Sequence, residues 1–461
     1  MADLKEYRIV IGKDATFNER RAAEFLRREI RIIMGAVLPV VSDDEPPVPY
    51  ELVVGRTARE QSENVRFSRS PDRLWEYELR FVNGRLFLTG LGEAPTEQEP
   101  FNSYRLIQDG AYGTVYAAYR FAETVLHDAF LFATYDSFRS LSHAEIDASC
   151  NFCYTKERLR AEMPRLLPGA AIYSIPSCEI LRLNMSCWII KTRSGKLIVI
   201  DGGHYADCEH VLACLRHISG EQRPRVAAWL FSHLHEDHYG VFHAIVQSPQ
   251  YCEQIRVDHV YEGLLPEKYY TEECTERFDG EEKVIRAILS ADETLGATVH
   301  HVRTGDCITV DEIGFDVLHV PDLKDGPEMD LNDTGVVYKM TYDGGQTVLF
   351  LSDAEKVCSR DLLENHRAEL KSDVVQAGHH GCGNVSKECY REIGARLCIF
   401  QVGERFWYGD NGEGLNTHNV GVIRTRAYLK ELGMETKNIL RDTDGILSMP
   451  LPIPIPYDAQ S

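Results

Sequence analysis

The sequence lacks the features that would mark a membrane or secreted protein. No apolar run in its 461 residues approaches the length of about 20 residues that a helix needs to cross a bilayer. The first residues, MADLKEYRIVIGKD, do not show a basic segment followed by an apolar one, so they do not resemble a signal peptide. These absences predict a cytoplasmic protein with no membrane partner.

Basic residues and paired cysteine motifs are also scarce. The 50 Lys and Arg stand against 71 Asp and Glu, which gives a formal net charge of −21. Because an acidic chain repels the phosphate backbone, we do not expect duplex nucleic acid as a partner. The 13 cysteines are odd in number and scattered along the chain, so they do not predict a disulfide framework.

The length of the chain indicates at least two domains, because 461 residues exceed one ordinary core. A polar stretch with little periodicity, at 140–168, contains the expected boundary near residue 165. Residues 1–165 are predicted to form a small α+β domain, with a helix over 22–33 and a hairpin at Asn83-Gly84. In residues 166–461 predicted strands and helices alternate, which is typical of an α/β domain.

The strongest chemical signal is the segment FSHLHEDHYG at 231–240, which continues an apolar run. It places the imidazoles of His233, His235 and His238 beside the carboxylates of Glu236 and Asp237. Crowding these groups at the end of a buried strand costs desolvation free energy unless something binds them. Imidazole nitrogen and carboxylate oxygen suit zinc, and also manganese or iron. The segment therefore predicts a metal site, with a solvated His-rich loop as the alternative.

The same segment fits the HxHxDH signature of the metallo-β-lactamase superfamily, and further motifs of that family follow in order. They are LIVIDGG at 197–203, VLFLSDAE at 348–355 and DVVQAGHHG at 373–381. The resemblance implies an αββα sandwich, in which two mixed sheets lie face to face with helices outside. The predicted fold class is therefore α/β, a metallo-β-lactamase sandwich preceded by the smaller α+β domain.

The resemblance also implies a centre of two divalent metal ions that share a bridging hydroxide. His233 and His235 would hold the first ion, and Asp237 and His238 would hold the second. Asp353 would bridge the two ions, and Asp237 would also count as a catalytic residue. Zinc is the expected metal, with manganese or iron as alternatives.

Further residues take supporting roles in this resemblance. One of His379 and His380 would complete the second metal site, and His380 is preferred. Asp201 resembles the carboxylate that orients the histidine loop from behind the ligands. His418, in LNTHN at 415–419, is a candidate to contact substrate or to donate a proton to the leaving group. The alternative for His418 is an ordinary loop histidine.

One motif departs from the commonest family pattern. Many members supply a third histidine to the first metal, whereas this chain has DLNDTG at 330–335. That segment resembles the subgroup of the competence-protein hydrolase domain and the phosphorylcholine esterases. We predict that Asn332 or Asp333 approaches the first metal. The rival, His319, lies within a predicted strand and is interpreted as structural.

The first domain resembles a different family. IVIG at 9–12, ELVVG at 51–55 and GTVYAAYRFAE at 113–123 are similar to the small domain that precedes the barrel of hexosaminidases and α-glucuronidases. No barrel follows here, so glycosidase chemistry is not implied. The first domain is predicted to be a scaffold or interaction domain, with glycan contact as the alternative.

These observations predict a metal-dependent hydrolase of a phosphodiester or another phosphorylated small substrate. One alternative is hydrolysis at a carbon centre, such as a lactone, a β-lactam or a thioester. A second is a di-iron oxidoreductase, although superfamily members of that kind usually carry Glu at the position of His235 and a flavin domain, and neither is visible. A third is a non-catalytic sugar-binding protein that uses the first domain.

Overall fold

The computed structural model of the chain describes residues 2–93, 112–126, 141–178, 184–273, 281–322, 329–410, 414–415, 417 and 421–457. The chain forms two compact units. The first unit comprises residues 1–159 together with 408–419, and the second comprises 160–407 together with 420–461. Within the described ranges, no helix is long and apolar enough to cross a membrane.

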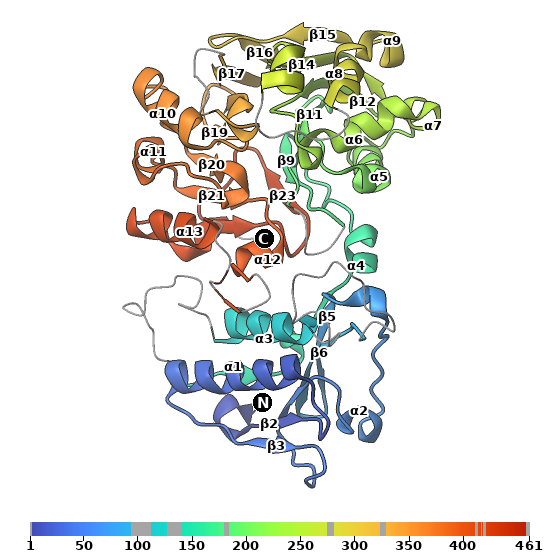
Figure 1. Cartoon of the computed structure of the whole chain (residues 1–461), viewed down its shortest axis with the longest axis vertical. Coiled ribbons are helices and arrows are strands. Elements are labelled where there is room, and N and C mark those ends of the chain that lie inside the picture. The colour runs from blue at the N-terminus through green and yellow to red at the C-terminus, as the bar shows by residue number, and fades with distance from the viewer. Residues whose placement is uncertain are drawn as a thin grey trace. The chain divides into compact units, whose positions relative to one another are not determined.

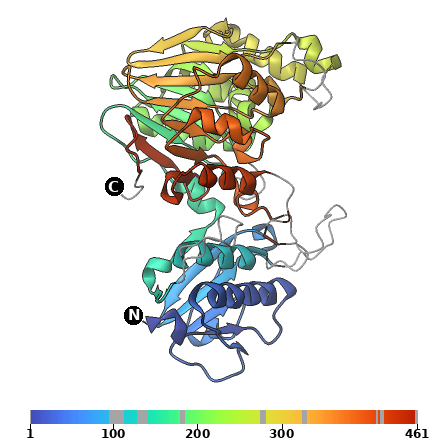
Figure 2. The same ribbon diagram turned by 90° about the vertical axis from the view of Figure 1, so that its left-hand side faces the viewer.

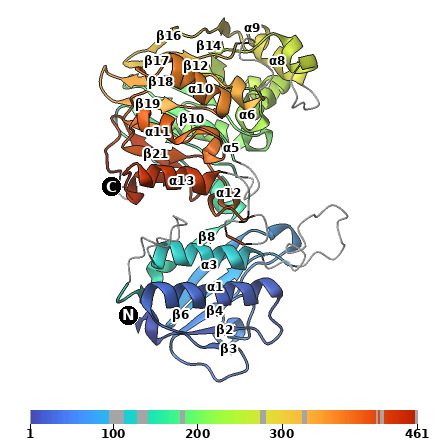
Figure 3. The same ribbon diagram turned by 60° about the vertical axis from the view of Figure 1, so that its left-hand side comes forward.

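The first unit is built on a six-stranded sheet in the order β3-β2-β4-β6-β5-β8, and helices α1 and α3 pack together over it (Figures 1 and 3). The hairpin predicted at Asn83-Gly84 joins β5 to β6, and both turn residues have positive φ, at 50° and 83°. The elements of this unit are β1 (Ala2–Asp3), β2 (Arg8–Ile11), α1 (Phe17–Met34), β3 (Val40–Ser42), β4 (Glu51–Val54), α2 (Arg59–Ser62), β5 (Tyr77–Val82), β6 (Arg85–Gly90), α3 (Tyr112–Val125), β7 (Glu145–Ile146), β8 (Phe152–Tyr154) and the start of α4 (Lys156–Ala161).

Helix α1 shows how the local sequence sets these elements. The Thr16 hydroxyl accepts the Glu19 N–H and the Glu19 carboxylate accepts the Thr16 N–H, a capping box that starts the helix. Gly35, at φ 67°, ends the helix in the left-handed conformation. The apolar face between these ends is buried, so the helix predicted over 22–33 is confirmed.

The second unit contains two sheets that face each other (Figures 1 and 2). The strand order of the first sheet is β15-β14-β12-β11-β10-β9-β23, and β13 (Arg256–Val257) also pairs with β12. Its main strands are β9 (Ala171–Ser174), β10 (Cys187–Lys191), β11 (Leu197–Asp201), β12 (Arg225–Leu230), β14 (His259–Glu262), β15 (Thr298–His301) and β23 (Leu447–Pro450). The helices α5 (Cys208–Ser219), α6 (Glu236–Gln247), α7 (Pro249–Cys252), α8 (Glu281–Leu289) and α9 (Ala291–Leu295) lie on its outer face.

The second sheet runs in sequence order from β16 to β22. Its strands are β16 (Cys307–Val310), β17 (Ile313–His319), β18 (Val337–Tyr342), β19 (Thr347–Phe350), β20 (Val374–Gln376), β21 (Leu397–Phe400) and β22 (Ile439–Arg441). Helices α10 (Lys356–Asn365), α11 (Lys387–Ile393) and α13 (Val422–Glu431) lie outside it (Figure 3). The αββα sandwich predicted from the sequence, preceded by an α+β region, is confirmed.

Strand alternation separates the two cores of the sandwich. In β11, Ile198 and Ile200 join the core between the sheets, whereas Leu197 and Val199 join the core beneath the helices. Both sets are almost fully buried, which explains why the first four positions of this strand are apolar. The polar residues that follow such strands therefore stand at the edge of the sandwich.

One stretch of the chain returns to the first unit late in the sequence. The backbone leaves the second unit after α12 (Glu404–Trp407) and is back in it at α13. The residues between, 408–419, are grouped with the first unit. The sequence prediction placed a single boundary near residue 165 and contained no such return.

Candidate metal centre

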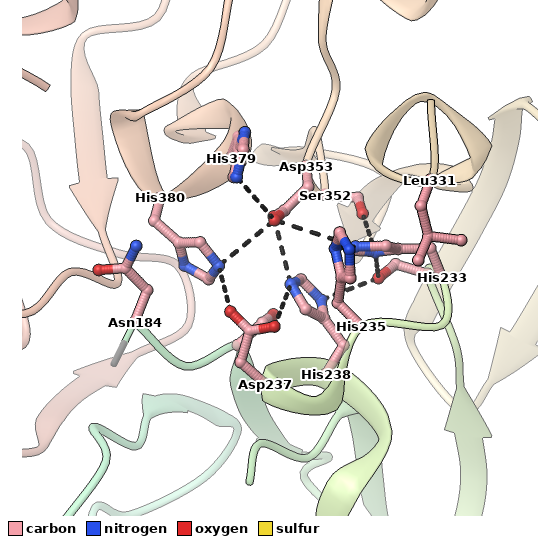
Figure 4. Close-up of polar contacts among 12 residues, drawn as sticks. Asn184, His233, His235, Asp237, His238, Leu331, Ser352, Asp353, His379 and His380 are labelled. Carbon is pink, nitrogen blue, oxygen red and sulfur yellow. Dashed lines mark hydrogen bonds and ion pairs between the residues drawn. The ribbon is translucent and has the colours of Figure 1, made fainter. Parts of the chain in front are cut away.

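The predicted site residues come from the carboxyl ends of strands in both sheets (Figure 4). Asp201 is the last residue of β11, and His233 follows β12. On the opposite sheet Asp353 follows β19, and His379 and His380 follow β20. Because parallel neighbours end at the same edge of a sheet, the two sheets present these side chains to one region.

The start of α6 supplies the remaining groups. His235 is the N-cap residue, with extended backbone at φ −87° and ψ 146°. Asp237 and His238 lie in the first helical turn, where the positive end of the helix dipole favours a carboxylate. The motif therefore places two imidazoles before the helix and two ligand groups in its first turn.

Two ligand groups form within the described residues, and Asp353 belongs to both. Atoms of Asp237, His238, Asp353 and His380 lie within 4.8 Å of one another, and so do atoms of His233, His235 and Asp353. The Nε2 atom of His380 lies 3.2 Å from Asp237 Oδ2 and 3.5 Å from Asp353 Oδ2. The Nε2 atom of His238 lies 3.3 Å from Asp353 Oδ1.

These side chains fit a divalent metal by two tests. Ligand atoms about 2.1 Å from one tetrahedral ion stand about 3.4 Å apart, close to the separations above. Among the described residues, His238 Nε2, His380 Nε2 and Asp353 Oδ1 are also buried without a hydrogen-bond partner. Because an unsatisfied buried polar atom is costly, these atoms fit the role of ligands to a divalent cation.

The charged groups of the cluster shift one another's pKa values. Burial by itself raises the pKa of Asp353, but the imidazoles of His380 and His238 lower it well below its usual value. The pKa of Asp237 is lowered overall in the same way, against the effect of burial. Burial lowers the pKa of His233 well below its usual value, so this imidazole is neutral. Burial by itself lowers the pKa of His238 and of His380, but the neighbouring carboxylates raise both, to about 10 for His380. Because metals bind ionised carboxylates and neutral imidazoles, these two histidines would release protons on binding a metal.

Asp201 lies directly behind the histidine loop. Its carboxylate contacts His238 Nδ1 at 2.8 Å and accepts hydrogen bonds from the hydroxyls of Ser186 and Ser232, both at 2.9 Å. It also accepts the backbone N–H of Ser232 at 2.8 Å. The His238 ring is thereby turned so that Nε2 faces the cluster. Sequence reasoning named Asp201 but not the two serines, whose residue type alone gives no signal.

Backbone strain gathers around this cluster. Asp201, Ser352, His379 and His380 all have positive φ, between 48° and 60°. Left-handed conformations outside glycine cost of the order of 1–3 kcal/mol each and persist only where the surroundings enforce them. Such strain is typical of ligand-binding sites, and here it lies on residues of the predicted site or next to one.

The structure distinguishes His379 from His380. His380 is 1% exposed and its Nε2 points into the cluster, whereas the side chain of His379 is 25% exposed. His379 Nδ1 contacts the Glu355 carboxylate at 2.8 Å, and its Nε2 lies 3.6 Å from Asp353 Oδ2. Glu355 ends the motif VLFLSDAE, and nothing in that local pattern predicts its contact with His379.

The three candidate ligands of the first metal, Asn332, Asp333 and His319, lie in different surroundings. Asp333 is not brought to the cluster: its carboxylate accepts the backbone N–H groups of Glu355, Val357 and Cys358 at the start of α10. This position does not fit the predicted ligand role, because a nearby helix terminus satisfies the oxygens. His319 Nδ1 contacts Asp361 at 2.7 Å and belongs to neither ligand group, and its structural role stays a prediction.

Asn332 is the remaining candidate ligand of the first metal. Its Oδ1 is buried and has no hydrogen-bond partner among the described residues. The preceding residue, Leu331, lies beside His233 in Figure 4. His418, the candidate for substrate contact or proton donation, lies outside the described residues.

A buried chain of polar groups extends behind His380. Its Nδ1 donates to the Gln401 carbonyl at 2.8 Å, which leaves Nε2 directed into the cluster. The Gln401 side chain donates to the Ser174 hydroxyl at 2.9 Å, and that hydroxyl donates to Asp442 at 2.8 Å. Asp442 also accepts the Val402 N–H at 3.2 Å. Sequence reasoning did not identify Gln401 or Ser174, which come from different parts of the chain.

Asp442 makes folding stability depend on pH. Burial raises the pKa of Asp442 to about 7, against an ordinary value of 3.8. Between these values the folded chain holds a proton that the unfolded chain has lost, so stability from this group falls as pH rises towards 7. We expect urea unfolding of metal-free Asp442→Asn to lack this part of the decline between pH 5 and 7.

A matched carboxyl serves as the control for that measurement. At Asp373 the opposing effect of burial is outweighed by hydrogen bonds from Thr347 and Arg396, which lower its pKa. The difference between the wild type and Asp373→Asn should therefore stay flat over the same pH range. Equal pH slopes for the wild type and Asp442→Asn would contradict the assignment.

The sandwich and its ligand cluster define an α/β domain with a candidate metal site. The sequence model of the metallo-beta-lactamase superfamily matches residues 182–381, a range that contains every ligand candidate named above. This chain therefore contains a metallo-beta-lactamase superfamily domain. The subgroup suggested by residues 330–335 and the likeness of the first unit to the pre-barrel domains remain predictions.

Several solved structures are similar to the chain. The metallo-beta-lactamase fold protein YhfI from Bacillus subtilis is 12% identical, with 60% of this chain and 99% of that one covered and a TM-score of 0.38. CmlA, a diiron beta-hydroxylase from Streptomyces venezuelae, is 12% identical over 62% of this chain and 55% of its own, with a TM-score of 0.37. MEM-A1, a subclass B3 metallo-beta-lactamase from a soil metagenome library, is 15% identical over 59% and 93%, with a TM-score of 0.31. No curated protein matches the sequence.

Proposed function

We propose that this protein is a metal-dependent hydrolase with a centre for two divalent ions. His233, His235 and Asp353 would hold the first ion. The second would be held by Asp237, His238, Asp353 and His380. The observation that carries the proposal is this pair of ligand groups sharing Asp353, with three buried atoms that have no hydrogen-bond partner in the described part of the chain.

The chemistry follows from that ligand set. When bound, divalent ions of this kind lower the pKa of a coordinated water and neutralise charge that develops on the substrate. The chain itself supplies fixed ligand orientation: Asp201 holds His238, and the Gln401 carbonyl holds His380. Rigid ligands of this kind keep the ions in place while a substrate binds and a product leaves.

For the substrate we propose a phosphodiester or another phosphorylated small molecule. The motif at 330–335 supports this choice through its resemblance to the phosphodiester-hydrolysing subgroup. The net charge of −21 argues against duplex nucleic acid and in favour of a small substrate. A glycan contact through the first unit is a separate proposal that rests on the weaker resemblance.

The test is reconstitution followed by a substrate panel. Metal-free protein is loaded with zinc, manganese or iron, and the metal content is measured by native mass spectrometry. Each form is then assayed on bis(4-nitrophenyl) phosphate, an aryl phosphorylcholine, a lactone, a thioester and a β-lactam. We expect two ions per chain and turnover of the phosphodiesters. Turnover of the carbon-centred substrates alone would favour the alternative, and a chain that binds no metal would overturn the proposal.

Asn332 is the proposed oxygen ligand of the first ion, directly or through a water molecule. We expect Asn332→Ala to weaken retention of one metal by about tenfold. Asp333→Ala is the matched neighbour: it should keep both metals but destabilise the fold by about 1–2 kcal/mol, because the N–H groups that begin α10 lose their acceptor. Chelator titration and urea unfolding measure the two effects. Weakened metal retention in His319→Ala alone would contradict the assignment.

A further inference from the structure

The segment that returns to the first unit late in the sequence is held there by the buried carboxylate of Asp410. Asp410 is 1% exposed and accepts hydrogen bonds from the hydroxyls of Tyr112 at 2.7 Å and Tyr119 at 3.0 Å, both on α3. It also accepts the N–H of Gly414 at 3.0 Å. A buried charge is tolerated only with such partners, so these donors hold the segment in one place.

The hydroxyl groups of Tyr112 and Tyr119 stay protonated at neutral pH and so remain hydrogen-bond donors. Burial and the neighbouring Asp410 carboxylate raise the pKa of Tyr112 and of Tyr119 well above the usual value. Both hydroxyls therefore remain protonated wherever the protein is folded. Tyr408 adds an aromatic contact to the same helix, with its ring 5.2 Å from that of Tyr119 and its hydroxyl donating to Glu123 at 2.7 Å. We call residues 408–410 and 414–415 the anchor segment.

The chain that enters the anchor segment comes directly from the metal centre. Gln401 carries the carbonyl that accepts His380 Nδ1 at 2.8 Å. Two residues on, the N–H of Gly403 donates to Asn184 Oδ1 at 3.0 Å, and the amide of that asparagine contacts Cys382 Sγ at 3.7 Å. Six residues lie between Gln401, whose carbonyl holds His380, and Tyr408.

After the anchor segment, the chain contacts the residues that follow His380. The N–H of Gly421 donates to the Cys382 carbonyl at 3.2 Å, and the Thr425 hydroxyl donates to the Gly381 carbonyl at 2.9 Å. Arg424 reaches Asn384 at 3.1 Å. We call residues 378–384 the metal-site loop. Both ends of the return are thus hydrogen-bonded to, or beside, this loop.

We propose that the first unit is a positioning device for the metal centre: by holding the anchor segment through Asp410, it keeps the metal-site loop in its ligand-binding conformation. The inference rests on the proposed metal site for its metal-binding consequence, but not for its conformational one. The loop needs such support because His379 and His380 both have positive φ. Asp410, Tyr112 and Tyr119 are positioning residues, and the first unit thereby acquires a role that does not require glycan binding.

The test uses the full chain with Tyr112→Phe and Tyr119→Phe combined. This double variant keeps both rings and removes two hydrogen bonds to Asp410, which weakens the attachment of the anchor segment to α3. Hydrogen exchange of metal-free protein is followed by mass spectrometry. We expect exchange to rise on the order of tenfold in the anchor segment and also in the metal-site loop. One metal should also be lost to chelator about tenfold more readily.

Tyr7→Phe is the matched control. It removes a tyrosine hydroxyl that is also buried in the first unit and has no hydrogen-bond partner among the described residues. This control should leave both peptides and both metals unchanged. Asp410→Asn, which keeps size but removes charge, should shift exchange in the same direction as the double variant and guards against simple misfolding.

The outcomes are distinct. Faster exchange in the anchor segment with an unchanged metal-site loop would mean that the anchor segment does not affect the conformation of the loop. This result would overturn the proposal. Unchanged exchange in both segments would overturn it as well. A wild-type chain that binds no metal would defeat the proposed function alone, because the exchange measurement on metal-free protein still decides the positioning role.

Discussion

Asp353→Ala should leave the protein without either metal. Asp353 belongs to both ligand groups, and its carboxylate lies within 3.5 Å of His238 Nε2 and of His380 Nε2. Without Asp353 the first site keeps only the imidazoles of His233 and His235. The second site loses the carboxylate that it shares with the first. We expect metal content near zero and a fall in kcat/KM on the order of 10⁴-fold, which is about 5 kcal/mol of transition-state stabilisation.

Native mass spectrometry and the phosphodiester assay measure these two quantities. Asp316→Ala supplies the control, because that carboxylate is exposed on β17 and forms no part of the cluster. It should keep two ions and nearly full activity. Retention of two ions by Asp353→Ala would show that Asp353 does not bridge the sites.

The second large effect separates adjacent histidines. His380→Ala should retain one ion and lose turnover on the order of 10³-fold, because a buried ligand atom of the second site is removed. His379→Ala should retain both ions, since its Nδ1 contacts Glu355 and a quarter of the side chain is exposed. The two variants remove the same group from neighbouring positions and so control for each other.

Metal stoichiometry decides between the two assignments. If His379→Ala loses an ion and His380→Ala does not, the ligand is His379 and the geometry described here changes on metal binding. An equal loss in both variants would indicate that the metal-site loop acts as a unit rather than through one imidazole.

Much of this architecture could be predicted because its signals are local. The motif at 231–240 follows an apolar strand, and polar groups at that place indicate a site whatever the rest of the chain does. The hairpin at Asn83-Gly84 and the helix capped by Thr16 are likewise set by a few neighbouring residues. Such features depend on spacing and on residue type, both of which the sequence displays.

The parts that could not be predicted depend on partners distant in sequence. Asp333 looks like a metal ligand until the start of α10 is seen to occupy its oxygens. His379 and His380 are adjacent and both left-handed, and only the structure shows that His379 Nδ1 contacts Glu355 whereas His380 Nε2 lies beside Asp237. The return of residues 408–419 to the first unit rests on two tyrosine hydroxyls that lie 298 and 291 residues from Asp410 in the sequence, and no local pattern indicates it.

That return has a consequence for biosynthesis. Tyr119 and Asp410 are separated by 291 residues, so a ribosome adding about 5–20 residues per second makes the second roughly 15–60 s after the first. During this interval the tyrosine face of α3 is without Tyr408 and Asp410. Although it begins the chain, the first unit cannot be completed before the second is nearly synthesised, and until then that aromatic face is a surface for chaperones or for misassembly.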